Sequence, residues 1–279
     1  VWNGSVGSGV VFRAGAGVGT VTRPGLPIPP GEPAINPVPR AMIRAAVAEA
    51  AAAVGRAADV VVEISIPDGQ ALARKTLNPR LGIVGGLSIL GTTGIVIPYS
   101  CAAWIHGITQ GIDVARAAGL THIAGATGRT SETAVAQLYR LPEIALIDMG
   151  DFAGGMLKYL SRHPIARVTI AGGFAKISKL AQGRLDLHSR RGAIDLGRLT
   201  RWLTDLGADA ATLAAAESAN TAQQILSLSR QQNIPLAQHI AGHALATANR
   251  TLSGTGIAVD VVIFDRDGCL AGRSAVETA

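Results

Sequence analysis

The stretch HIAGATGRTSETAVAQLYRLPEIALIDMGDFAGGMLKYLSRHPIARVTIAGGFAK, residues 122–176, decides the fold of the C-terminal part of the chain. Strand-like runs at 122–126, 144–149 and 168–171 alternate with helical patterns at 131–140, 152–162 and 175–181. Strands separated by single helices of this length require right-handed parallel crossovers. The stretch therefore predicts an α/β parallel sheet that is covered by helices on both faces.

The segments on either side extend this prediction to the whole chain. A helix is expected at 100–118, helices dominate from Ile194 to about Arg250, and a last strand is expected at 258–264. Upstream, residues 9–22 resemble two short strands of a hairpin around a glycine turn, and Asn36 opens a helix that runs to about Val54. We predict an α/β protein in two parts. Residues 1–99 form a β-rich part with one long helix, and residues 100–279 form a Rossmann-like parallel-sheet domain with extra helices.

Three loops at the predicted strand ends are rich in glycine and polar residues: 125–132, 148–155 and 171–176. Ligands of open parallel sheets bind beyond the carboxyl ends of the strands, where helix N-termini favour negative charge. Glycines there permit close approach of a nucleotide-like cofactor, and a carboxylate suits ribose hydroxyls. The predicted cofactor-binding residues are Gly125, Thr127, Gly128, Asp148, Gly150, Asp151, Gly172 and Gly173.

Two alternatives remain open for these loops. Thr130, Ser131 and Asp151 are each equally consistent with simple helix capping. The string GATGRT at 125–130 partly resembles the G-x-G-x-x-G fingerprint, so an NAD(P)-dependent oxidoreductase is the first alternative function.

A second glycine-rich stretch, NPRLGIVGGLSILGTTGIVIPYS at 78–100, carries five glycines with hydroxyls between them. Such density suits backbone that turns sharply or lets a ligand approach the main chain. Residues 81–112 contain no Asp, Glu, Lys or Arg, but Pro98 and seven glycines interrupt the run, which disfavours a membrane span. The predicted substrate-binding residues of this region are Arg80, Ser88, Thr92 and Thr93, although Arg80 is equally consistent with a structural ion pair.

The distribution of charge points to an acidic partner. The chain carries a net charge of +6, and ten basic residues against two acids lie between residues 158 and 201. This pattern indicates a polyanion or a small molecule with many carboxylates, with a solvated basic surface as the alternative. The predicted substrate-binding residues here are Arg129, Lys176, Lys179, Arg190 and Arg191. His188 is the candidate acid or base, with helix capping as its alternative role.

The remaining reactive side chains give no metal site. The two cysteines, Cys101 and Cys269, have no metal or disulfide spacing and are expected to be small core residues in a reducing cytoplasm. His239 and His243 are four residues apart, which is a zinc-ligand spacing, but no Glu lies next to His239 and no third ligand is evident. We therefore expect these two histidines to be structural.

Several segments, in this order, resemble the cobalt-precorrin-5B C1-methyltransferase (CbiD) family of anaerobic cobalamin biosynthesis. They are INPVPR, NPRLGIVGGLSILGTTGIV, GIDVARAAG, GRTSE, MGDFAGG, the Lys/His segment at 172–195 and the closing VVIFDRDG. The resemblance implies transfer of the S-adenosylmethionine methyl group to carbon 1 of cobalt-precorrin-5B. The substrate is then an acidic tetrapyrrole that carries its own cobalt, in keeping with the basic segment.

The resemblance also implies that a further N-terminal segment of the family, with a Thr/Gly-rich opening and an acidic loop, is missing here. The expected setting is the cytoplasm, without nucleic acid or membrane. The oligomeric state stays open, a homo-oligomer included. A non-catalytic polyanion-binding module is the second alternative function, but Tyr159, Phe174 and Trp202 are few aromatic residues for stacking on nucleic acid.

Overall fold

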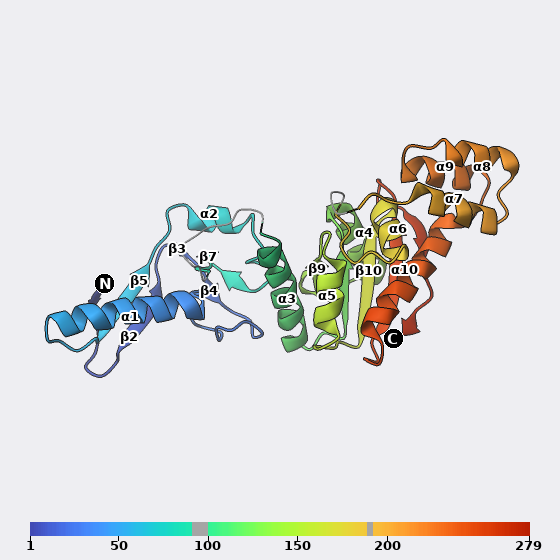
Figure 1. Ribbon diagram of the computed structural model, residues 1–279. Helices are drawn as coiled ribbons and strands as arrows, with labels where there is room; N and C mark the ends of the chain where they lie inside the picture. Colours follow the sequence, from blue (N-terminus) through green and yellow to red (C-terminus); the bar gives the residue numbers. More distant parts are fainter. Residues whose placement is uncertain (91–99, 189–191) are drawn as a thin grey trace. The chain divides into compact units, whose positions relative to one another are not determined.

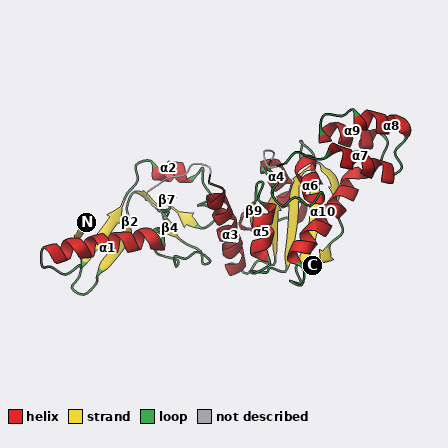
Figure 2. Cartoon of the chain, viewed as in Figure 1, coloured by secondary structure: helices red, strands yellow, loops and turns green. Residues whose placement is uncertain are grey.

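A computed structural model describes residues 1–90, 100–188 and 192–279 of the protein. The chain divides into two compact units, which are coloured in chain order in Figure 1. Residues 1–103 with 113–118 form the N-terminal unit, and residues 104–112 with 119–279 form the C-terminal unit. Helix α3 (Cys101–Ala117) contributes residues to both. Figure 2 shows that both units mix helices and strands, so the protein is a mixed α/β protein.

The sheet of the N-terminal unit is centred on β5 (Val60–Ile64). This strand pairs antiparallel with β1 (Trp2–Asn3) and parallel with β2 (Val10–Ala14). Helix α1 (Pro37–Ala53) begins after Asn36, as the proline at its first position predicts. It packs Ile43 and Val47 against a small core of Phe12, Ile35 and Val62.

The hairpin predicted within residues 9–22 is wrong. Strand β3 (Gly17–Val18) pairs parallel with β7 (Gly86–Leu87), and β4 (Thr20–Val21) pairs antiparallel with β6 (Ile83–Val84). Helix α2 (Gly69–Ala73) packs against β3 and β7. A Cβ atom on Gly17 would lie 2.1 Å from the carbonyl oxygen of Ile66, and one on Gly86 would lie 2.1 Å from that of Gly17. These glycines therefore permit backbone-to-backbone packing between segments that are distant in the sequence.

The C-terminal unit is built on one sheet whose central strands are parallel. Its order is β9 (Leu146–Asp148), β8 (His122–Ala126), β10 (Arg167–Gly173), β11 (Ala258–Phe264) and β12 (Leu270–Arg273). Strands β8, β9, β10 and β11 run parallel, whereas β12 and the short β13 (Glu277–Thr278) pair antiparallel with β11. A 3-10 turn, η1 (Glu143–Ala145), precedes β9. The antiparallel ending of the sheet was not predicted.

Helices cover both faces of this sheet. Helix α4 (Arg129–Tyr139) packs Ala134 and Val135 over one face, where Ala124 and Val262 belong to the same core cluster. Helices α5 (Ala153–Leu160), α6 (Phe174–Ala181) and α10 (Leu236–Leu252) pack together on the sheet. Gly125, one residue after Ala124, faces α5, because a Cβ there would meet the Met156 sulfur at 2.3 Å. Successive strand residues thus alternate between the two helical layers.

A group of short helices follows α6: α7 (Leu196–Asp205), α8 (Ala210–Glu217) and α9 (Ala222–Gln231). They pack on one another, and α9 also contacts α6. Among the described helices, none is long and apolar enough to span a membrane.

The prediction that both cysteines lie in the core is wrong, since both are exposed. Cys101 is the first residue of α3, and Cys269 lies in the tight turn after β11, where its N–H donates to the Asp265 carboxylate. Both positions are at the ends of elements, which the small apolar character of cysteine does not reveal.

Candidate functional site

A hollow of about 430 Å³ opens at the carboxyl ends of the parallel strands in the C-terminal unit. Strands β8 and β10 are neighbours here. The chain after β8 leads to β9 on one side of this pair, and the chain after β10 leads to β11 on the other side. This is where ligands bind in open α/β sheets. The lining residues are Thr127, Gly128, Arg129, Thr130, Ser131, Gly173, Phe174, Ala175, Lys176, Thr221, Ala222, Gln223, Phe264, Asp265 and Arg266.

The N-termini of α4, α6 and α9 meet at this hollow. Gly128 is the N-cap of α4 and Gly173 is the N-cap of α6, and neither provides a side chain that covers the first N–H groups. Thr221 caps α9 in a capping box with Gln224. Each helix N-terminus carries partial positive charge on N–H groups that lack intrahelical acceptors. The hollow is therefore suited to an anionic group.

Three cationic residues line the same hollow: Arg129, Lys176 and Arg266. The Lys176 ammonium donates to the carbonyl oxygen of Thr127 at 2.8 Å, which ties α6 to the end of β8. It also forms an ion pair with Asp151 Oδ1 at 3.1 Å, without the alignment of a hydrogen bond. Lys176, which ends the predicted loop 171–176, thus connects all three predicted ligand-binding loops.

The predicted cofactor-binding glycines fall into two groups. Gly128 and Gly173 line the hollow, and a Cβ on either would meet no atom within 4 Å. Gly125 and Gly172 lie inside strands, where a Cβ would collide with Met156 or with Thr127 and Ile177. Gly150 has a φ of +53° and lies against the Trp104 ring. Packing or backbone conformation therefore explains the glycine at each of these last three positions, whether or not a ligand binds.

Neither of the two predicted carboxylates belongs to the lining of the hollow. Asp148 ends β9, and its carbonyl oxygen accepts a hydrogen bond from Trp104 Nε1 at 3.1 Å. Asp151 follows in the turn before α5, held by Lys176. A role for either in binding a ribose stays a prediction.

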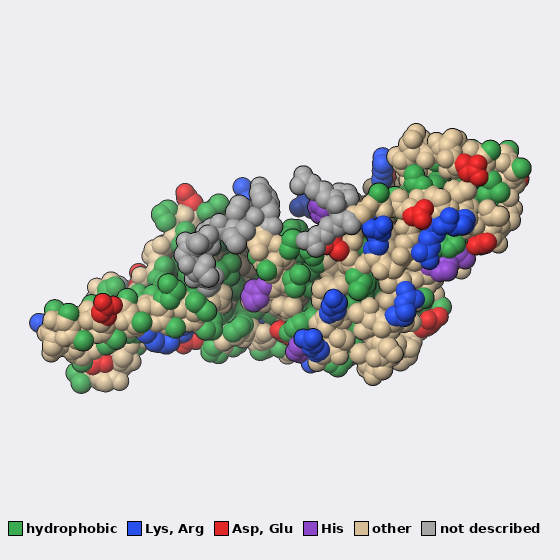
Figure 3. All heavy atoms as spheres, viewed as in Figure 1, with side chains coloured by type: hydrophobic (Ala, Val, Ile, Leu, Met, Phe, Trp, Pro, Cys, Tyr) green, Lys and Arg blue, Asp and Glu red, His purple; other side chains and the backbone are tan. Residues whose placement is uncertain are grey.

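On the face shown in Figure 3, the Lys and Arg side chains of the C-terminal unit lie in separate groups and form no single continuous patch. Lys179 is only 8% exposed and donates to the carbonyl oxygen of Leu187 at 3.0 Å. The three-residue spacing had suggested that Lys176 and Lys179 share an exposed helical face. Because Lys179 is buried, they do not. His188 is exposed, and its backbone N–H donates to Asp186 at 3.0 Å.

The other predicted substrate residues belong to the N-terminal unit or to undescribed positions. Ser88 donates to the buried Asn78, whose amide donates to the carbonyl oxygen of Gly86. Arg80 is partly buried, and its carbonyl oxygen accepts from Arg23. Thr92, Thr93, Arg190 and Arg191 lie outside the described residues.

Sequence reasoning missed two segments of the hollow, the start of α9 and the turn after β11. In that turn, Asp265 accepts from the N–H groups of Asp267 and Cys269 and from Arg230. Burial raises the pKa of the Asp265 carboxyl, but these donors outweigh it and hold the pKa below its usual value. These hydrogen bonds hold the turn, and its Arg266 lines the hollow. A polar DRDG run directly after an apolar strand was the available signal.

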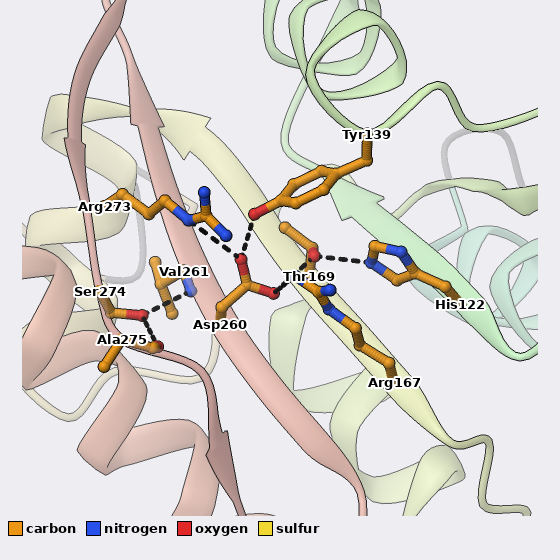
Figure 4. A network of polar contacts seen from close by, with 9 residues as sticks. All are labelled: His122, Tyr139, Arg167, Thr169, Asp260, Val261, Arg273, Ser274 and Ala275. Atoms are coloured by element: carbon orange, nitrogen blue, oxygen red, sulfur yellow. Dashed lines mark hydrogen bonds and ion pairs between the residues drawn. The ribbon is translucent and has the colours of Figure 1, made fainter.

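A second polar cluster lies toward the amino ends of the strands, and Figure 4 shows its members. Asp260 of β11 is fully buried and accepts from Tyr139 and from Thr169, the latter at 2.7 Å. Arg167 donates to it at 3.2 Å, and Arg273 forms an ion pair at 3.8 Å. Because the cluster joins α4, β10, β11 and β12 away from the ligand-binding edge, we assign it to the stability of the fold.

His122 extends this cluster through a contact of 2.8 Å between its Nε2 and Thr169 Oγ1. Since Thr169 gives its only hydroxyl proton to Asp260, the histidine Nε2 carries the proton and donates. Burial, the hydrogen bond to Asp260 and the Asp260 charge raise the pKa of Tyr139 to about 12. The charges of Arg273 and Arg167 act in the opposite direction and lower this pKa. Burial and then Arg167 lower the pKa of His122, against the opposite effect of Asp260.

The lowered pKa of His122 predicts a loss of stability in mild acid. Below pH 6.5 the unfolded chain binds a proton on His122 that the folded chain excludes, so stability falls as pH falls through that window. The lowered pKa of His243 acts in the same direction. Urea midpoints between pH 7.5 and 5 should fall less steeply in His122→Gln than in the unmodified chain. Identical slopes would contradict the assignment.

Comparison with known proteins gives the family. The model described as CbiD matches residues 1–98, and the model described as CbiD, C-terminal domain, matches residues 186–275. A protein of a Bradyrhizobium species, named cobalt-precorrin-5B C(1)-methyltransferase, is 67% identical over 267 residues, which cover 96% of this chain and 71% of that protein. A protein of the same name from Methylorubrum extorquens is 61% identical, with 96% and 74% covered.

Among solved structures, the crystal structure of a cobalamin biosynthesis protein (cbiD) from Archaeoglobus fulgidus is 26% identical. The match covers 68% of this chain and 57% of that chain, with a TM-score of 0.29. The sequence identities to the two bacterial relatives carry the assignment. This chain belongs to the CbiD family.

Proposed function

We propose that this chain transfers the methyl group of S-adenosylmethionine to carbon 1 of cobalt-precorrin-5B. The acceptor and the carbon are those in the names of relatives that are 67% and 61% identical to it over almost its whole length. The reaction belongs to cobalamin biosynthesis, and cobalt enters as part of the substrate. The names do not state the methyl donor. The geometry of the hollow supports S-adenosylmethionine as that donor.

The observation that supports the donor site is the meeting of three helix N-termini with three cationic side chains around one hollow. The carboxylate of an amino-acid group fits that environment, because N–H groups and Arg129, Lys176 and Arg266 all favour negative charge. Phe174 and Phe264 supply apolar wall for the nucleoside. When bound, S-adenosylmethionine supplies an electrophilic methyl group on a sulfonium sulfur.

The size of the hollow favours the donor over the acceptor as its ligand. Its volume of about 430 Å³ lies in the range of pockets for small ligands. A tetrapyrrole with its carboxylate side chains is much larger than S-adenosylmethionine and would extend beyond these walls. Arg129 and Lys176, predicted as substrate ligands, are therefore proposed to hold the donor.

The chain's part in the chemistry is alignment of the two reactants. An electron-rich ring carbon attacks the methyl group directly, so the reaction asks for positioned reactants and not for a protein nucleophile. Lys176 fixes the end of β8 relative to the loop of Asp151, and the hydrogen-bonded turn at Asp265 fixes the opposite wall. These contacts hold the hollow in shape before any ligand arrives.

Calorimetric titration with S-adenosylhomocysteine, beside a parallel titration with NAD, tests the proposal. We expect saturable binding of S-adenosylhomocysteine alone, and Arg266→Ala should weaken it at least about tenfold, or about 1.4 kcal/mol. Arg162→Ala is the matched control, because Arg162 is exposed and lies outside the lining. Binding of NAD alone would support an oxidoreductase instead. Unchanged affinity in Arg266→Ala would remove the hollow as the donor site.

A further inference from the structure

A pair of histidines on α10 lies outside the hollow and has no part in the proposed reaction. His239 and His243 are one helical turn apart, and their Nε2 atoms approach to 3.0 Å. Trp202 of α7 stacks on the His243 ring with a centroid distance of 4.8 Å and an interplanar angle of 15°. The same indole contacts the His239 ring edge-on at 5.9 Å. Trp202 thus holds both rings with their nitrogens together.

This separation suits two ligands of one metal ion. Imidazole nitrogens bind zinc at about 2.0–2.1 Å, so two ligands at a tetrahedral angle are about 3.3–3.4 Å apart. The observed 3.0 Å needs only a small opening of the pair to reach that value. Without a metal, the same contact is a hydrogen bond in which one ring donates a proton to the other.

The surroundings leave room for water to complete the coordination. The two histidines line a hollow of about 490 Å³ together with Gln238, Arg273 and Glu277. The Arg198 guanidinium lies over the Trp202 ring, 5.1 Å from its centroid, and Arg273 forms an ion pair with Asp260. Among the described residues no third His, Cys, Asp or Glu completes a cluster of three metal ligands.

We propose that His239 and His243 bind one divalent transition-metal ion, such as Zn²⁺, Ni²⁺ or Cu²⁺, through their Nε2 atoms, with water in the remaining positions. The helical spacing alone did not support such a site, because it supplied no third ligand. The 3.0 Å approach, the indole that orients both rings and the adjoining hollow are what favour it. The site is independent of the methyl-transfer reaction and of its donor.

Titration of the tag-free chain with ZnCl₂, NiCl₂ and CuCl₂ tests this site. Calorimetry should give one saturable ion per chain, and His239→Gln or His243→Gln should each weaken binding at least about tenfold, or about 1.4 kcal/mol. His106→Gln is the matched control, because His106 is exposed on α3 and has no histidine one turn away. Binding that survives in the double variant His239→Gln/His243→Gln would overturn the proposal, as would absence of binding in the folded chain.

Fluorescence provides a second measurement that a purely structural histidine pair would not affect. Cu²⁺ bound by His243 should quench Trp202, whose ring is stacked on that histidine. Trp202→Phe should abolish the saturable quenching while it keeps the calorimetric binding, with circular dichroism used to verify folding. Quenching of equal size in Trp202→Phe would place the ion elsewhere and contradict the proposal.

Discussion

Replacing Asp260 with asparagine is expected to lower the free energy of unfolding of the C-terminal unit by about 3 kcal/mol. The Asp260 carboxylate is fully buried and accepts from Tyr139 and Thr169 while it neutralises Arg167 and Arg273. An asparagine keeps the shape but replaces one acceptor oxygen with an NH₂ donor. That donor faces other donors, and the two guanidinium groups lose their counter-charge.

Urea unfolding followed by tryptophan fluorescence is a suitable measurement, because two of the chain's three tryptophans, Trp104 and Trp202, lie in the C-terminal unit. Asp209→Asn is the control, with the same chemical change at an exposed N-cap where asparagine serves equally well. It should change stability by less than about 0.5 kcal/mol. Tyr139→Phe should give a smaller loss than Asp260→Asn, about 1 kcal/mol. If Asp260→Asn were as stable as the control, the cluster would not hold the sheet together.

The elements of the C-terminal unit were largely predictable because their signals are local. Strands β8 and β11 have the predicted bounds, and helices α4, α5 and α6 begin and end within about two residues of the predicted positions. The role of Asp260 was not predictable in the same way. It is one acid in an apolar strand, and its partners Tyr139, Arg167 and Thr169 come from segments about 90 to 120 residues away. No local pattern reveals which side chains will meet such a carboxylate.

The N-terminal unit shows the opposite situation. Its glycines at 15, 17 and 19 are typical of a hairpin turn, yet β2, β3 and β4 each pair with a strand at least 45 residues later. A glycine that turns the chain and a glycine that lets another backbone approach look identical in sequence. At Gly17 both explanations apply, because its φ is +80° and a Cβ there would lie 2.1 Å from the Ile66 carbonyl oxygen.

The candidate site was predictable in its location and not in its full membership. Parallel strands end at one edge, so the loops at Thr127 and Gly173 had to meet. Whether the N-terminus of α9 joins them depends on how α9 packs on α6, which is a tertiary contact. The same limit explains why Gly125 and Gly172 were predicted as ligand contacts, although their neighbours in space are Met156 and Thr127.

Replacing Gly173 with leucine is expected to weaken S-adenosylhomocysteine binding at least about 100-fold, or about 2.8 kcal/mol, while the fold is preserved. Gly173 lines the hollow as the N-cap of α6, and a Cβ there meets no atom within 4 Å. Its φ of −73° is open to any residue, so leucine introduces no backbone strain. The leucine side chain would occupy space in the hollow. The loss of a favourable N-cap residue should cost at most about 1 kcal/mol of stability.

Gly173→Ser separates the effect of bulk from the effect of changing the glycine itself. Serine is a preferred N-cap residue and is small, so this variant should bind within about tenfold of the unmodified chain, or about 1.4 kcal/mol. Calorimetry on both variants, with thermal unfolding as the test of folding, gives the comparison. If Gly173→Leu bound the ligand as well as Gly173→Ser, the donor would have to lie outside this hollow. The methyl-transfer proposal rests on sequence identity to the named relatives and would survive that result, whereas the roles of Arg129, Lys176 and Arg266 would not.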